Sequence, residues 1–187
     1  MLSSRDDFPG RDRRIRAVAW LLAGCCVATV LRPAHAIAST PSDPLAAPLE
    51  QTCISSPFGW RHAVGPHAPA GFHDGIDLAA PAGAAVRAVA SGQIAAIRRR
   101  GVGGLSVFVH LSDGRTALYA HLGTVSAKLA NGARDVARGD QLGRVGRSGI
   151  TYGTHLFFAV FEGNQPIDPE PLLGIPRCER PVSNPDR

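Results

Sequence analysis

Apolar and polar residues alternate in short runs along the middle of the chain. The runs 105–111 and 115–122 flank Ser112-Asp113-Gly114, a turn composition typical of a β-hairpin. No uninterrupted stretch keeps a helical period for three turns. The pattern therefore predicts an all-β domain, with further short strands at 86–89, 94–97, 141–145 and 155–162.

The first 36 residues follow a different pattern. Four arginines between positions 11 and 16 precede the apolar run 17–31, and Ala34-His35-Ala36 provides a small-x-small cleavage site. The run is too short for a bilayer span of ~20 residues, so it predicts a secretory signal peptide and an exported, periplasmic protein. Leu22-Ala23-Gly24-Cys25 resembles a bacterial lipobox. An outer-membrane lipoprotein anchored through Cys25 is therefore the alternative.

The mature chain divides into three parts. Residues 37–52 hold three prolines among Ala and Ser and are predicted to be a linker, 53–178 the domain, and 179–187 a tail. Cys53 and Cys178 flank the periodic region and are the two cysteines that remain after signal removal. In an oxidising compartment they predict a disulfide, with two unpaired thiols in mobile tails as the alternative.

Charge and composition narrow the possible partners. The 187 residues carry a formal net charge of +5, and residues 1–36, with six Arg and three Asp, account for +3 of it. The rest lacks the clustered charge that nucleic acid or an anionic membrane surface requires, and no membrane span is expected in the mature chain. Arg98-Arg99-Arg100 is interpreted as a solvated turn, with acidic cell-wall polymers as a possible partner.

One pair of residues has the spacing of a metal site. His73 and Asp77 are four residues apart in a stretch expected to be extended, so their side chains share a face. An imidazole nitrogen with a carboxylate oxygen suits tetrahedral zinc. Taken alone, the pair is more typical of a surface histidine beside an aspartate.

Further motifs in the same order give the pair more weight, because together they resemble the lysostaphin-type (LytM) zinc endopeptidases, which cut peptide cross-links in bacterial peptidoglycan. The resemblance implies a short-stranded antiparallel β-sandwich, or barrel-sandwich hybrid, of the LytM type over 53–178. The motifs are Ser56-Pro57-Phe58-Gly59-Trp60-Arg61, the H-x-G-x-D stretch from His73 to Asp77, Tyr119-Ala120-His121-Leu122, the stretch from Gly139 to Gly146, Gly153-Thr154-His155-Leu156-Phe157-Phe158 and Ile167-Asp168-Pro169.

The resemblance also implies roles for individual residues. His73 and Asp77 fall on two zinc ligands of the family. His121 falls on the histidine of the Y-A-H motif and His155 on the first histidine of the H-x-H motif, both of which are catalytic in the family. In an active member, zinc polarises the scissile carbonyl and lowers the pKa of its bound water towards ~7, while the imidazoles handle protons and charge.

One position departs from the family pattern. The second histidine of H-x-H is the third zinc ligand, and here the residue is Phe157, which has no lone pair to donate. Since period two places residue 157 on the face of His155, the phenyl ring is expected at the ligand's place. The sequence therefore predicts a degenerate, zinc-deficient domain that binds peptidoglycan or regulates a separate cell-wall hydrolase, as degenerate members of the family do.

The alternative is an active zinc endopeptidase with a substitute third ligand. His62 and His67 lie in the Gly/Pro-rich segment before His73, where a loop could bring one of them over the site. His110 lies on a predicted hairpin strand at a spacing that matches no ligand of the family, so it is interpreted as structural.

Overall fold

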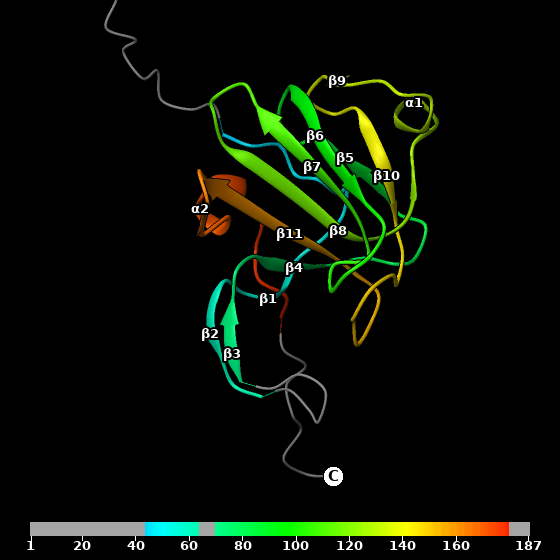
Figure 1. The fold of residues 1–187 in the computed structure, drawn as a ribbon. Helices are drawn as coiled ribbons and strands as arrows, with labels where there is room; N and C mark the ends of the chain where they lie inside the picture. Colours follow the sequence, from blue (N-terminus) through cyan, green and yellow to red (C-terminus); the bar gives the residue numbers. More distant parts are fainter. Residues whose placement is uncertain (1–43, 64–69, 180–187) are drawn as a thin grey trace, which may run out of the picture. The chain divides into compact units, whose positions relative to one another are not determined.

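The computed structural model describes residues 44–63 and 70–179, and within them it contains twelve β-strands and two single-turn helices (Figure 1). The all-β prediction is confirmed. The predicted signal peptide, the first part of the predicted linker, His67 and almost all of the predicted tail lie outside the described residues. In the described part of the chain, no helix has the length and apolar character needed to cross a bilayer.

The strands form one large antiparallel sheet and one small hairpin. The large sheet has the order β1-β4-β11-β8-β7-β6-β9; in addition, β10 pairs with β5 and β8, and β12 pairs with β11, while β2 and β3 form the hairpin. The elements are β1 (Ile54–Ser56), β2 (Gly59–Arg61), β3 (Gly71–His73), β4 (Ile76–Ala79), β5 (Ala85–Arg87), β6 (Gly92–Arg98), β7 (Leu105–Leu111), β8 (Thr116–Val125), α1 (Ala127–Ala130), β9 (Asp135–Val136), β10 (Gln141–Val145), β11 (His155–Glu162), β12 (Gln165–Ile167) and α2 (Glu170–Leu173).

The hairpin predicted around Ser112-Asp113-Gly114 is formed by β7 and β8. Asp113 stabilises its turn, because its carboxylate accepts hydrogen bonds from the backbone N–H of Arg115 at 3.0 Å and from the Arg115 guanidinium at 2.9 and 2.6 Å. Gly114 has a φ of 89°, which a residue with a side chain rarely adopts.

The core lies beneath the inward faces of β4 to β8, β10 and β11. Its largest fully buried side chains include Ile76, Tyr119, Leu142, Leu156 and Phe158. The hydroxyl of Tyr119 accepts a hydrogen bond from the N–H of Val89 at 3.0 Å, so this polar atom is satisfied inside the core. Burial raises the pKa of Tyr119, which keeps the phenol neutral.

The second part of the predicted linker belongs to the folded domain, which corrects the boundary at residue 53. Leu45 and Leu49 are 4% and 2% exposed and pack into the core. The N–H of Leu45 donates to the carbonyl of Leu172 at 3.0 Å, and the carbonyl of Pro48 accepts from Arg87 at 2.9 Å. Prolines exclude a helix here, but an extended segment with two leucines can still cover apolar surface.

The predicted disulfide between Cys53 and Cys178 is present, with Cα atoms 4.8 Å apart. Backbone pairing holds the same two segments together. Ile54 donates to the carbonyl of Pro176 at 2.9 Å and accepts from the N–H of Cys178 at 2.9 Å. The bond therefore joins segments that the fold already places side by side.

Candidate functional site

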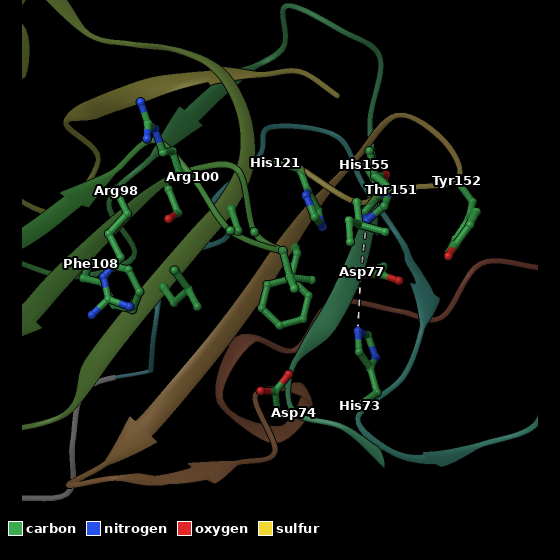
Figure 2. A pocket seen from close by; sticks show the side chains of 18 of the residues that line it. His73, Asp74, Asp77, Arg98, Arg100, Phe108, His121, Thr151, Tyr152 and His155 are labelled. Carbon is green, nitrogen blue, oxygen red and sulfur yellow. Dashed lines mark hydrogen bonds and ion pairs between the residues drawn. The ribbon is translucent and has the colours of Figure 1, made fainter. Parts of the chain in front are cut away.

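The sequence-predicted residues converge on one cleft of about 410 Å³. Its walls include His73, Asp77, His121, His155 and Phe157, which come from β3, β4, β8 and β11. Figure 2 shows the three histidines and Asp77 close together near one end of the cleft. The prediction that these five side chains share a cleft is confirmed.

Asp77 lies between two imidazoles. Its Oδ1 is 3.4 Å from Nε2 of His73 and 3.4 Å from Nε2 of His155, and its Oδ2 is 3.7 Å from Nη1 of Arg61. Burial alone would raise the pKa of Asp77. The hydrogen bond with His73, the charge that His155 and His73 carry when protonated, and the charge of Arg61 outweigh burial, and the pKa of Asp77 is lowered. The group is therefore a carboxylate at neutral pH.

Backbone carbonyls fix the orientation of two of the histidines. Nδ1 of His73 donates to the carbonyl of Pro57 at 2.8 Å, and Nδ1 of His121 donates to the carbonyl of Ser148 at 2.9 Å. Because a carbonyl accepts only, these bonds place a proton on Nδ1 in each ring and leave Nε2 for chemistry in the cleft.

A β-bulge directs His121 into the cleft. Leu118 and Ala120 line the cleft while Tyr119 is in the core, so alternation alone would turn residue 121 towards the core. His121 instead has a φ of 62°, the only positive value for a non-glycine among the described residues. The β7–β8 register shifts at this point, and β8 goes on to pair with β10. Such a bulge re-aims a side chain, at the cost of local strain.

His155 is held by Asp77 on one side and by Thr151 on the other. Nδ1 of His155 is 3.3 Å from Oγ1 of Thr151, and that hydroxyl donates to the carbonyl of Gly153 at 2.7 Å. The hydroxyl therefore accepts from Nδ1–H. Burial lowers the pKa of His155; the charge of Asp77 opposes this effect and the nearby His121 adds to it. Sequence reasoning missed Thr151, since no periodic pattern connects a loop threonine to a strand histidine.

Phe157 occupies the position expected for the third zinc ligand. It pairs with Asp77 of β4 on one side and with Ala120 of β8 on the other, so the three form one row across the sheet. The ring centre of Phe157 is 5.4 Å from that of His73 and 6.1 Å from that of His121. The ring also packs against Gly75, where an added Cβ would lie 2.7 Å from Cζ of Phe157.

The donor set does not fit the zinc site that the resemblance implies. His73 supplies an imidazole and Asp77 a carboxylate, but a phenyl ring stands at the third position, where it replaces a lone pair with apolar bulk. Over residues 44–63 and 70–179, no three His, Cys, Asp or Glu side chains form a group that could hold a metal ion.

Of the two histidines considered as substitute ligands, His62 is described, and it lies outside the cleft. His62 is exposed and is not part of the cleft wall, and His67 falls outside the described residues. His110 is exposed on β7, where its Nδ1 is 2.9 Å from Oγ1 of Thr116 on β8. This contact across the hairpin agrees with the structural role predicted for His110.

Arg98-Arg99-Arg100 is solvated, as interpreted from the sequence, and two of its residues also belong to the cleft wall. All three are exposed, but Arg98 and Arg100 line the cleft, together with Phe108 of β7. Residues 98–100 lie at the end of β6, whose pairing with β7 places them along the cleft. Sequence spacing could not reveal this pairing.

Comparison with known proteins agrees with this geometry. The family model for Peptidase family M23 matches residues 71–169, which include all five residues of the site. The chain belongs to peptidase family M23. This confirms the lysostaphin-type resemblance and its fold.

Three similar proteins show the extent of the likeness. The DD-carboxypeptidase/endopeptidase Mpg of Neisseria meningitidis serogroup B is 40% identical over 122 residues, which cover 65% of this chain and 27% of that protein. A zinc-containing peptidase from Vibrio cholerae is 25% identical with a TM-score of 0.59, over 67% of this chain and 39% of that one. The lysostaphin catalytic domain of Staphylococcus simulans is 26% identical with a TM-score of 0.52, over 65% and 89%. The chain thus spans about a quarter of the length of its Neisseria relative.

Proposed function

We propose that this protein is an exported M23 domain that binds peptidoglycan peptides in its cleft without cutting them, and that regulates a separate cell-wall hydrolase. The observation that carries the proposal is Phe157, placed in one row with Asp77 and with its ring beside His73. Relatives named for action on peptidoglycan, such as the Neisseria DD-carboxypeptidase/endopeptidase, support the choice of ligand.

The polar side chains of the cleft are suited to binding a peptide. Three imidazoles, the Asp77 carboxylate and the Arg61 guanidinium offer hydrogen-bond donors and acceptors to a peptide backbone. Their orientations are fixed by contacts with backbone and with one another, so little conformational entropy is lost when a ligand binds. The phenyl ring of Phe157 adds apolar surface to the same wall.

The test combines binding, metal content and cleavage. Purified protein, loaded with zinc and then dialysed, is mixed with isolated cell-wall sacculi, and we measure cosedimentation, zinc per chain and released peptides. We expect saturable binding, zinc well below one per chain and no release of peptides. A second assay measures how the protein changes the rate of a separate cell-wall hydrolase on the same sacculi.

One observation favours a second candidate, an active zinc endopeptidase with a substitute third ligand. Nε2 of His155 lies as close to Oδ1 of Asp77 as Nε2 of His73 does. When both rings are neutral and carry their proton on Nδ1, two nitrogen lone pairs meet a carboxylate, and a cation would stabilise that arrangement. The three groups would have to draw closer to hold it, because among the described residues no group of three forms a metal site as it stands.

Zinc content of two variants separates the candidates. Stoichiometric zinc that is lost in His155→Ala but kept in His121→Ala, together with cleavage that requires His121, would establish the second candidate and exclude the first. Low zinc in the wild type and in both variants supports the first.

A further inference from the structure

The cleft has a second end that the zinc-site comparison does not explain. Figure 2 shows Arg98, Arg100 and Phe108 at this end, away from His73 and Asp77, with His121 between the two groups. Apolar side chains from Val102, Leu118 and Ala120 also line the cleft. The cleft therefore combines a cluster of imidazoles and carboxylate, apolar wall and a strongly cationic end.

The Arg98 side chain is held in place by an aromatic ring. Its guanidinium carbon lies 4.6 Å from the ring centre of Phe108, which faces it from the neighbouring strand β7. A guanidinium stacked on a ring keeps its N–H groups available in the guanidinium plane, where they can form two parallel bonds with a carboxylate. The contact leaves the donors of Arg98 free for a ligand.

Neither arginine at this end is neutralised by a carboxylate of the described residues. Over the described residues, Arg98 and Arg100 form no ion pair with a carboxylate, whereas Arg61, Arg115 and Arg177 each have one. Two unpaired guanidinium groups on the wall of one cleft create a positive potential that attracts an anionic group to that end.

The adjacent residue provides an internal comparison. Arg99 carries the same charge and is also exposed, but it does not line the cleft. The run of three arginines is therefore divided by the fold into two residues that face the cleft and one that does not.

We propose that Arg98 and Arg100 form a carboxylate-binding subsite, which receives the free C-terminal carboxylate of a cell-wall peptide lying along the cleft. The proposal rests on the proposed peptidoglycan-binding function and adds the polarity and end group of the ligand. The apolar middle of the cleft accommodates small side chains of the peptide, and the imidazole and Asp77 end contacts its backbone.

The experiment measures binding of the peptidoglycan tetrapeptide and of its C-terminal amide by calorimetry. For the full-length protein we expect the amide to bind about tenfold more weakly, because it lacks the charge-assisted hydrogen bonds. In Arg98→Gln/Arg100→Gln the free acid should weaken about tenfold and lose its advantage over the amide. The single variant Arg98→Lys should bind the free acid with an affinity between those of the wild type and the double variant, because an ammonium group cannot form the bidentate pair.

The matched control is Arg99→Gln/Arg138→Gln, which removes two exposed charges from outside the cleft. It should change both affinities less than twofold. An equal loss in the control and in the cleft variant would assign the effect to net charge and overturn the subsite. Equal binding of acid and amide by the wild type would also overturn the subsite, while leaving peptidoglycan binding intact. If the wild type binds neither peptide nor sacculi, the proposed function fails and the subsite fails with it.

Discussion

The substitution Phe157→His is the most direct test of why this site departs from its family. Residue 157 lies opposite Asp77 across the β4–β11 pair, and its ring centre is 5.4 Å from that of His73. The strand register is fixed by Leu156 and Phe158, which are fully buried on the other face. An imidazole in place of the phenyl ring should therefore face the same two donors and complete a set of three.

The expected magnitudes can be worked from this geometry. Loss of a group that only orients a ligand commonly costs ~10–100-fold in metal affinity, so restoring a ligand should raise zinc affinity by at least ~100-fold. Without metal, the partly buried imidazole should lower the free energy of unfolding by about 1–2 kcal/mol. Zinc at 100 times its dissociation constant returns ~2.7 kcal/mol, which corresponds to a rise in Tm of about 10 °C for a domain of this size.

The assay is thermal unfolding with and without zinc, alongside the zinc content of dialysed protein. Phe157→Gln serves as the matched control, because it introduces a polar side chain without an imidazole. We expect a large zinc-dependent rise in Tm for Phe157→His only, and its loss when His73→Ala is added. An equal rise in the wild-type protein, or none in Phe157→His, would refute the reasoning that residue 157 determines metal binding.

Three further predictions concern the scaffold. Replacing Cys53 and Cys178, which are 125 positions apart, with Ser should lower the free energy of unfolding by about 5 kcal/mol, measured by urea titration. A loss below about 1 kcal/mol would contradict the loop-entropy account. Asp113→Asn should lower the free energy of unfolding by about 1–2 kcal/mol at pH 7, because the buried Arg115 loses its carboxylate partner. The pKa of Asp113 is lowered from 3.8: burial raises it, but the hydrogen bonds with Arg115 outweigh burial. The Asp113 carboxylate therefore stabilises the folded state above that pH and ceases to do so on further acidification. The free energies of unfolding of the wild type and of Asp113→Asn should converge at lower pH. Gly75→Ala should lower the free energy of unfolding by about 1–3 kcal/mol, because its Cβ would lie 2.5 Å from a backbone oxygen of β11. An unchanged midpoint of urea unfolding would contradict this prediction.

The sequence predicted the parts of the fold that carry a clear period. Strands β7, β10 and β11 have the predicted bounds, and face parity in β11 correctly placed His155 and Phe157 on one wall. The strands that sequence analysis missed are β1 to β4, β9 and β12, which are two to four residues long and too short to show alternation. Long-range pairing, rather than local pattern, creates them.

The remaining differences have the same physical origin. Nothing local in Tyr119-Ala120-His121 shows that a bulge turns the histidine away from the core side, because the strain is maintained by contacts with distant backbone. Leu45 lies among prolines, which are visible in the local sequence and are typical of a linker. Its hydrogen-bond partner Leu172 is 127 positions away, so no local pattern indicates the contact. The role of Arg98 in the cleft likewise required the pairing of β6 with β7.

The pairing of Ile54 with Arg177 has a consequence for how such a domain is carried in longer chains. Because Ile54 bridges Arg177 and the N–H of Leu45 bonds to the carbonyl of Leu172, the first segments of the domain are held against its last ones. A unit whose two ends meet can be added to, or inserted into, another protein without separating the segments on either side. This property suits a domain that corresponds to only 27% of its Neisseria relative. In evolutionary terms, the closed edge makes the domain portable, because it can be joined to other chains without opening its sheet.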